Sequence, residues 1–143
     1  MKISTRGRYG MRVLIDLAEH ANESHVTLAS IAEREGISLR YLEQVVVIMR
    51  RAGFIQSVKG ASGGYRLARD PREIIVGDVL RALEGDMLVV DPPAPADRGN
   101  RLKRCLINTV YEPLNRLIAA IIDNQTLESL VGTKDSEELM YFI

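Results

Sequence analysis

The feature that most limits the fold is a pair of short helical patterns joined by a single glycine. The first pattern starts after Thr27, a favoured N-cap residue, and ends at Gly36. The second starts at Ser38, another N-cap candidate, and carries apolar residues at helical spacing as far as Met49. Ala32 and Gly36 are small residues, and we expect that a bulky side chain at either position would push the two helices apart. Such a pair is typical of a helix-turn-helix.

A β-hairpin pattern follows directly. Residues 55–58 alternate like a strand, residues 59–64 (KGASGG) form a glycine-rich turn, and residues 65–69 alternate again. The glycines allow a positive φ at the tip and a close approach of another backbone. Lys59 and Arg66 place cations beside the turn. Alone, such a hairpin would be merely structural, but after a helix-turn-helix it predicts the wing of a winged helix.

The fold class we predict is mainly α with a small β-hairpin, a winged helix-turn-helix followed by a long dimerisation helix. We expect two parts, a DNA-binding domain over 1–85 and, over 86–143, a loop, the dimerisation helix and a C-terminal segment. The remaining predicted elements are a first helix over Thr5–Ala21, a helix over Ile74–Glu84 ended by Gly85, a loop over 91–100, a long helix from Leu102 to Ile122 and a short helix from the cap Thr126 to Leu130.

The net charge of zero hides an asymmetry between the two halves. Residues 1–69 hold 11 Lys and Arg against 6 Asp and Glu, whereas residues 70–143 hold 8 against 13. A locally basic surface of this kind attracts a polyanion. One cysteine excludes an intrachain disulfide framework, and no apolar run is long enough to cross a bilayer or to serve as a secretory signal. We therefore expect a cytoplasmic protein without a membrane partner.

Side chains in the first turns of the second helix of the pair are placed to enter a major groove. Arg40 and Gln44 share a helix face, and arginine recognises guanine while glutamine recognises adenine. Glu43 can accept from cytosine and would repel phosphate, so it favours discrimination over affinity. The alternative is an ordinary solvated face. The residues predicted to contact DNA are Arg6, Arg8, Tyr9, Ser38, Arg40, Tyr41, Glu43, Gln44, Lys59, Gly60, Ser62, Gly63 and Gly64.

Two groups of cations receive different interpretations. Arg6 and Arg8, with Tyr9, begin the first helix, where the positive end of the helix dipole would assist phosphate contact. Arg50 and Arg51 stand in the last turn of the second helix of the pair, where cations ordinarily complement the dipole.

The long helix carries more apolar surface than a small domain needs. Its expected use is pairing with the same helix of a second chain, and the alternative is packing across its own winged domain. Pro113 requires either a kink or a new helix that starts with the proline in its first turn. The residues predicted to form the dimer contact are Leu106, Val110, Leu114, Leu117, Ile118, Ile121 and Ile122.

No catalytic constellation stands out, so we expect no enzyme. His20 and His25 are poorly spaced for one metal site, and the glycine turn lacks the residues of a phosphate loop. Cys105 is a candidate redox thiol because Lys103 and Arg104 beside it favour the thiolate, although an inert thiol is an equal alternative. The competing functional class is a winged-helix module that binds protein without specific DNA binding.

Four runs match a known family: MKISTRGRYGMRVLIDLA, IAEREGISLRYLEQ, VKGASGGYRLAR and IIVGDVLRALEG. Together they resemble the IscR, NsrR and CymR family of bacterial winged-helix regulators over nearly the whole chain. The resemblance implies a homodimer with crossed long helices that binds a partly palindromic operator near a promoter. It also implies that the second helix of the pair reads the major groove and that the wing, Lys59 to Gly64, inserts at the minor groove.

The resemblance departs at the cofactor. Iron–sulfur members of the family hold a cluster with three cysteines and a fourth ligand, and only Cys105 matches one of them here. One thiolate cannot hold such a cluster, so we expect no cofactor unless the natural protein has further cysteines. The ending ELMYFI is similar to that of the cysteine-metabolism branch, which implies a partner enzyme of cysteine synthesis. The expected function is a sequence-specific repressor in cysteine, sulfur or iron–sulfur metabolism.

Overall fold

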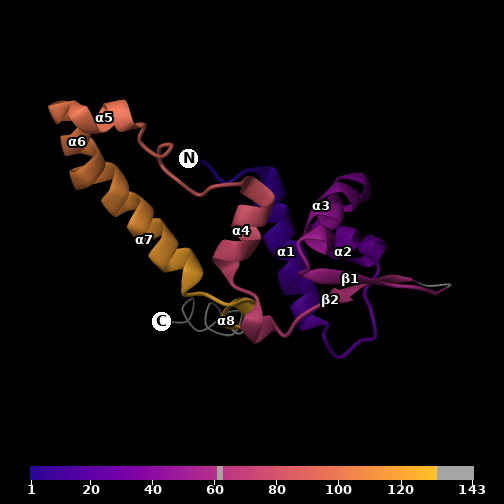
Figure 1. The fold of residues 1–143 in the computed structure, drawn as a ribbon. Coiled ribbons are helices and arrows are strands. Elements are labelled where there is room, and N and C mark those ends of the chain that lie inside the picture. The colour runs from indigo at the N-terminus through magenta and orange to yellow at the C-terminus, as the bar shows by residue number, and fades with distance from the viewer. Residues whose placement is uncertain (61–62, 132–143) are drawn as a thin grey trace, which may run out of the picture.

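The helix-turn-helix forms as its caps predict. In the computed structural model, which describes residues 1–60 and 63–131, the pair consists of α2 (Leu28–Glu35) and α3 (Leu39–Arg51) (Figure 1). The Thr27 hydroxyl accepts from the Ser30 N–H at 3.2 Å, and the Ser38 hydroxyl accepts from the Tyr41 N–H at 3.4 Å. Each cap satisfies a backbone N–H that the helix itself leaves unpaired.

Gly36 has a different role from the one predicted. It adopts a φ of 63°, and a Cβ built on it would meet nothing within 4 Å. The expectation that a side chain here would push the helices apart is therefore wrong. The glycine is needed because the C-cap of α2 is left-handed, a conformation that costs other residues free energy.

The hairpin consists of β1 (Ile55–Val58) and β2 (Gly64–Leu67), which pair antiparallel with Val58 opposite Gly64. Val26, ahead of α2, adds a third backbone segment because it exchanges two 2.8 Å hydrogen bonds with Tyr65. A Cβ on Gly64 would overlap the Val26 carbonyl, and Gly60 has a φ of 151°. The predicted close approach and positive φ are thus confirmed.

Two further helices complete the winged body. α1 (Thr5–Glu19) ends two residues before the predicted boundary, and α4 (Val76–Glu84) begins two residues after it. α4 starts late because residues 74 and 75 are extended and pair with the chain ahead of α8 (Leu127–Val131). Gly85 ends α4 with a φ of 83°, as predicted. A short 3-10 turn, η1 (Pro71–Glu73), joins the hairpin to this segment.

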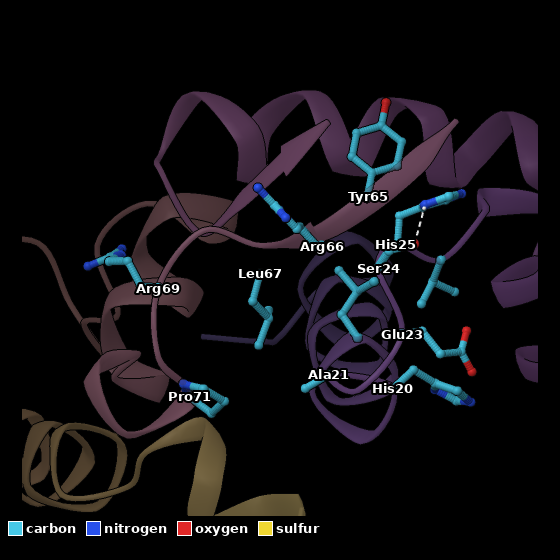
Figure 2. Close-up of a pocket in the computed structure, with 12 residues that line it drawn as sticks. His20, Ala21, Glu23, Ser24, His25, Tyr65, Arg66, Leu67, Arg69 and Pro71 are labelled. Atoms are coloured by element: carbon cyan, nitrogen blue, oxygen red, sulfur yellow. Dashed lines mark hydrogen bonds between the residues drawn. The ribbon is translucent and has the colours of Figure 1, made fainter. Parts of the chain in front are cut away.

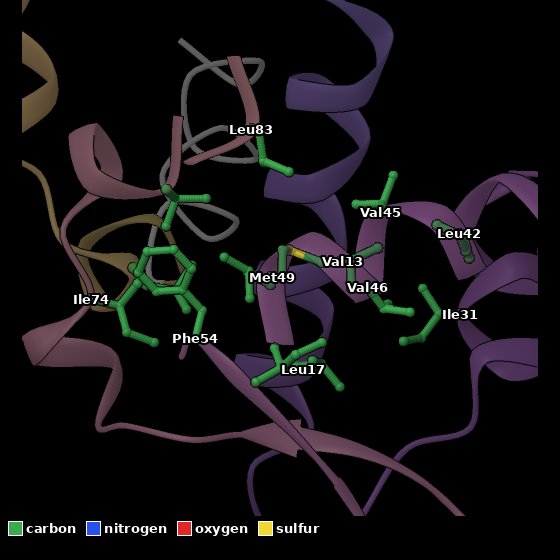
Figure 3. Close-up of a cluster of buried hydrophobic side chains, with 14 of the residues drawn as sticks. Val13, Leu17, Ile31, Leu42, Val45, Val46, Met49, Phe54, Ile74 and Leu83 are labelled. Atoms are coloured by element: carbon green, nitrogen blue, oxygen red, sulfur yellow. The ribbon is translucent and has the colours of Figure 1, made fainter. Parts of the chain in front are cut away.

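One apolar core holds these elements together. α1 supplies one side of it and α3 the other, and α4 and α8 close the end away from the hairpin (Figure 3). A Cβ on Gly10 of α1 would overlap the Leu83 side chain, so this glycine lets α4 approach α1 closely. The buried side chains of the core are Val13, Leu14, Leu17, Val26, Ile31, Ile37, Leu42, Val45, Val46, Met49, Phe54, Ile55, Ile74, Val79, Leu83 and Leu127.

A long rod, residues 101–123, extends away from the winged body (Figure 1). It consists of α6 (Arg101–Leu106), the π-helical turn η2 (Ile107–Tyr111) and α7 (Glu112–Asp123). In η2 the Glu112 N–H donates to the carbonyl of Ile107, five residues back. Pro113 lies in the first turn of α7, one of the two predicted outcomes, and the wide π turn precedes it.

The predicted loop over 91–100 is wrong in part. It contains a short helix, α5 (Pro95–Gly99), whose first residue is a proline. Proline at a helix start loses nothing because the first N–H groups have no partner inside the helix.

The Thr126 hydroxyl accepts from the Ser129 N–H at 3.2 Å and caps α8 as predicted. Within the described ranges, no helix combines the length and apolar character needed to cross a membrane.

Candidate nucleic-acid interface

The N-terminal half of α3 presents a polar face to solvent. Arg40, Glu43 and Gln44 are exposed, while Leu42 and Val45 on the opposite face are completely buried. Among the described residues, none forms a hydrogen bond or ion pair with these three side chains. Their polar groups are therefore free for a partner, and the first of them lies two residues beyond the cap Ser38, which is also exposed.

Sequence reasoning missed part of this face. Leu39 is 43% exposed and Val47 is 38% exposed, although both are apolar residues of α3. Val47 follows Gln44 by three residues and Glu43 by four, so it extends the same stripe. The helical spacing from Arg40 would have shown this. An apolar side chain here suits the methyl group of thymine.

Two tyrosines predicted as DNA contacts meet each other. The rings of Tyr9 on α1 and Tyr41 on α3 pack edge to face with centroids 5.4 Å apart. The Arg12 guanidinium lies 5.6 Å from the centre of the Tyr9 ring and also donates to the Glu35 carboxylate at 2.9 Å. Both rings are partly buried, so they help to set the position of α3 against α1.

A buried carboxylate fixes α2 to α1. Asp16 is 3% exposed, and the Arg34 guanidinium donates to its two oxygens at 2.7 and 2.9 Å. This hydrogen bonding raises the pKa of Arg34 above its ordinary value, and the charge of Asp16 adds to the effect. His20 lies 3.4 Å from the same carboxylate. The angle between the two helices is thereby set by a charged pair as well as by the core.

The start of α1 differs from the expectation for a phosphate site. Arg6 and Arg8 are exposed, and Arg8 donates to the Thr5 hydroxyl at 3.1 Å. The backbone N–H groups at this end, however, are occupied by the Glu84 carboxylate, which accepts from Ser4 and Gly7 at 3.0 Å each. The helix dipole is already complemented by an anion, so only the arginine side chains remain to meet phosphate.

The wing contributes fewer free groups than predicted. Lys59, Gly60 and Gly63 are exposed, whereas Gly64 lies against the backbone of Val26 and Ser62 falls outside the described residues. With the Gln56 amide oxygen turned toward it, Arg66 donates from Nε at 2.6 Å and from Nη2 at 3.0 Å. Lys59 is also a cation beside the turn, but it is exposed and has no partner across the strands in the described part of the chain.

The predicted dimer contact divides into two groups. Ile118 and Ile122 face the same chain, where they pack against Val76, Leu80 and Met87. The outer side chains form a stripe along the rod, which we call the rod stripe. It comprises Leu102, Leu106, Val110, Leu114, Leu117 and Ile121, each between 39% and 63% exposed.

The donor set around Cys105 does not fit an iron–sulfur cluster. The chain has one cysteine, and the described residues contain no group of three His, Cys, Asp or Glu side chains placed to hold a metal ion. Cys105 is exposed on α6. Its flanking cations are engaged elsewhere, since Lys103 pairs with Asp97 at 2.8 Å and Arg104 donates to the Arg98 carbonyl at 2.9 Å.

A hollow of about 270 Å³ lies between the end of α1 and β2 (Figure 2). Ser24 and His25 at its rim are 3.0 Å apart, which is within reach for a nucleophile and its base. They are adjacent on a surface loop, and no carboxylate in the described chain is hydrogen-bonded to His25 to orient it. The hollow therefore offers no catalytic arrangement.

A helix-turn-helix with an exposed recognition face, followed by a hairpin, defines the class of winged-helix regulators. The chain belongs to the Rrf2 family, because residues 3–133 match the family described as iron-dependent transcriptional regulators. It is 39% identical over 135 residues to Protein rrf2 of Nitratidesulfovibrio vulgaris, covering 92% of this chain and 87% of that one. It is 37% identical over 144 residues to the regulator CymR of Bacillus subtilis, with 99% and 97% covered.

Solved structures agree with these relatives. The structure of T. potens IscR matches with a TM-score of 0.74 at 42% identity, covering 97% of this chain and 90% of that one. CymR, described as the global cysteine regulator of B. subtilis, also matches at 0.74, with 36% identity and 94% and 98% covered. The resemblance and the fold class predicted from the sequence are confirmed. The chain is a DNA-binding transcriptional regulator and not an enzyme.

Proposed function

We propose that this chain acts as a homodimer that represses transcription by reading a partly palindromic duplex with one α3 from each copy. The observation that carries the proposal is the exposed, unpartnered face of Arg40, Glu43 and Gln44 beside the hairpin. A helix presents such side chains from its N-terminal turns when it enters the major groove. Arg6, Arg8 and Lys59 supply the phosphate or minor-groove contacts around it.

The rod stripe supports the homodimer. A row of exposed apolar side chains along the outer face of a helix is typical of a surface that another helix covers. A second copy of the same rod satisfies both partners at once through a two-fold axis. A two-fold axis would relate the two α3 helices, so the two half-sites would be inverted copies of one another, which is why we propose a partly palindromic site.

We keep the division of labour predicted from the sequence. Residues 1–85 would contact DNA, and the later part would pair the copies through residues 101–123. The chain then returns to the winged body, since Leu127 is completely buried in the main core. Any change in how the rods pair would thus reach the DNA-binding body through α4 and α8.

The chemistry of the chain favours a signal that is sensed without a resident iron–sulfur cluster. One exposed thiol can undergo oxidation, but it cannot supply the four ligands a cluster needs. We therefore propose a cytoplasmic role in sulfur metabolism, with Cys105 as the redox thiol and an enzyme of cysteine synthesis as partner. The likeness to CymR, described as a global cysteine regulator, supports this choice.

The test begins with selection of duplexes from a random pool by the purified protein. Binding to the selected duplex is then measured by fluorescence anisotropy against a scrambled duplex. Because the homodimer carries each change twice and one bidentate base contact contributes about 1–3 kcal/mol of discrimination, Arg40→Ala and Gln44→Ala should each weaken specific binding by about 2–6 kcal/mol, which is roughly 30-fold or more. Lys59→Ala should lower affinity for both duplexes and reduce the salt slope by about two, roughly one for each copy, if Lys59 meets phosphate, or change the preferred sequence if it enters the minor groove.

Arg50→Ala is the matched control, because Arg50 is an exposed cation on the same helix but in its last turn. It should leave discrimination unchanged. Unaltered specific binding in both Arg40→Ala and Gln44→Ala, with normal circular dichroism, would contradict the proposed interface. Failure of the parent protein to bind any duplex at low salt would favour a winged-helix module that binds protein.

A further inference from the structure

A carboxylate from a distant element caps the helix that begins the chain. Glu84, the last residue of α4, accepts from the Ser4 N–H at 3.0 Å, the Ser4 hydroxyl at 2.6 Å and the Gly7 N–H at 3.0 Å. The Ser4 hydroxyl also accepts from Gly7, at a longer 3.4 Å. The first turn of α1 is therefore held mainly by a residue 80 positions away and only partly by its own N-cap.

Space for this carboxylate is built into α1. A Cβ on Gly7 would overlap Glu84 Oε1, and a Cβ on Gly10, one turn later, would overlap Leu83. Glycine weakens a helix interior, so two glycines in the first two turns make α1 depend on what packs there. What packs there is the last turn of α4. Without it, the start of α1 has a weak cap and two poor helix formers.

The other contacts of α4 lead to the rod. The Arg81 guanidinium donates to both oxygens of Asp123, the last residue of α7, at 2.7 and 2.9 Å. A Cβ on Gly77 would overlap the same carboxylate, so α4 is also shaped to receive it. Arg81 and Glu84 are separated by one helical turn. α4 thus has a polar contact with the rod through Arg81 and one with the start of α1 through Glu84, in addition to its apolar contacts.

The residues that depend on this cap are those expected to meet DNA. Arg6 and Arg8 lie in the first turn of α1 and are exposed. The Arg8 N–H donates to the Ser4 carbonyl at 3.0 Å, and its side chain donates to Thr5, so the arginine position follows that of the first turn. We propose that Glu84 is a positioning residue for DNA binding, which orders the first turn of α1 so that Arg6 and Arg8 reach phosphate. This inference rests on the proposed function.

The sign of the effect separates positioning from plain electrostatics. Glu84 is an anion close to a surface that would face a polyanion, so its removal should tighten DNA binding if only charge mattered. Positioning predicts the opposite. Each phosphate contact contributes about 0.9 to the salt slope, which amounts to roughly a tenfold change in affinity between 50 mM and 1 M salt.

The experiment compares Glu84→Gln with the parent protein on the selected duplex across a salt series. Glu84→Gln should weaken binding at least roughly 10-fold at 50 mM salt and reduce the salt slope by up to about 3.6, as for two lost phosphate contacts in each copy of the dimer. In an Arg6→Ala, Arg8→Ala background the same change should have no further effect. Hydrogen exchange in residues 3–10 should accelerate, while exchange in α3 stays the same.

Three results would overturn the inference: unchanged or tighter binding by Glu84→Gln, an effect that adds fully to Arg6→Ala and Arg8→Ala, or unchanged exchange at the start of α1. Ser4→Ala, which removes one partner of Glu84 and keeps its charge, repeats the test if Glu84→Gln does not fold. Ser4→Ala should show the same pattern with a smaller loss of binding. If the parent binds no duplex, the proposed function itself fails, whereas failure of Glu84→Gln alone leaves that function standing.

Discussion

Leu117 is the residue at which the proposed dimer can be tested most sharply. Its side chain is 61% exposed on the rod stripe. Full burial of a leucine stabilises by about 1.5–3 kcal/mol, so covering this exposed part would contribute about 1–2 kcal/mol in each copy. Because a two-fold dimer carries the change twice, Leu117→Ala should cost about 2–4 kcal/mol of association free energy, or roughly 30- to 1000-fold in the dimer Kd.

The matched control is Ile118→Ala, one residue further along the same helix. Ile118 packs against Val76 and Leu80 of its own chain, so its truncation should lower the thermal stability of each copy more than the dimer Kd. Alanine favours helix at least as well as either residue, so neither variant should unwind the rod. Sedimentation equilibrium over a concentration series gives the Kd, and circular dichroism gives the Tm.

Concentration adds an independent measure. If dimerisation stabilises the fold, the Tm of the parent should rise with protein concentration, and this dependence should weaken in Leu117→Ala. The reasoning is refuted if Leu117→Ala associates as tightly as the parent, or if the parent remains a monomer at concentrations well above micromolar. Either result would mean that the rod stripe is covered by something other than a second copy.

Two further predictions concern stability. Gly10→Ala should lower the Tm, because overpacking against Leu83 costs about 1–3 kcal/mol while the gain in helix propensity is about 1 kcal/mol. The control Gly99→Ala should not lower the Tm, because a Cβ at Gly99 would have open space around it. Equal Tm changes in the two variants would contradict the close α1–α4 packing. The Arg72 side chain and N–H lower the pKa of Asp70 from 3.8 to about 2, so its contribution to stability is present above pH 4 and is lost as pH falls through 2. The Tm difference between the parent and Asp70→Asn should therefore shrink between pH 4 and pH 2, and a constant difference in melting experiments would argue against the ion pair.

Local patterns were sufficient for most of the winged body. Thr27, Ser38 and Thr126 act as the caps that their residue types predict, because an N-cap depends on only the next three residues. The glycine-rich turn between two alternating runs likewise indicated the hairpin and the close approach at Gly64. Such features depend on neighbours in sequence, which a single chain displays directly.

Features that depend on distant partners were not predictable in this way. Glu84 caps α1 from 80 residues away, and Arg34 pairs with Asp16 from a separate helix. Periodicity placed Leu117 and Ile118 together in one apolar stripe, but neighbouring helix positions point about 100° apart, and only the position of α4 decides which of them is buried. The loop predicted over 91–100 contains α5, because a proline such as Pro95 is favourable at a helix start.

The geometry of the rod links these observations to function. Residues 101–123 extend over about 34 Å at the rise of an α-helix, and their outer apolar side chains are uncovered by the described part of the chain. Most helical stability in proteins comes from packing of an apolar face, and among the described residues of the rod only the inner Ile118 and Ile122 pack against the cluster of Val76, Leu80 and Met87. In the proposed homodimer, a second rod would supply that packing. Asp123 at the end of the rod binds Arg81 of α4, and Glu84 of α4 caps the helix that carries Arg6 and Arg8. In the proposed dimer, these contacts would link the pairing of the rods to the position of Arg6 and Arg8.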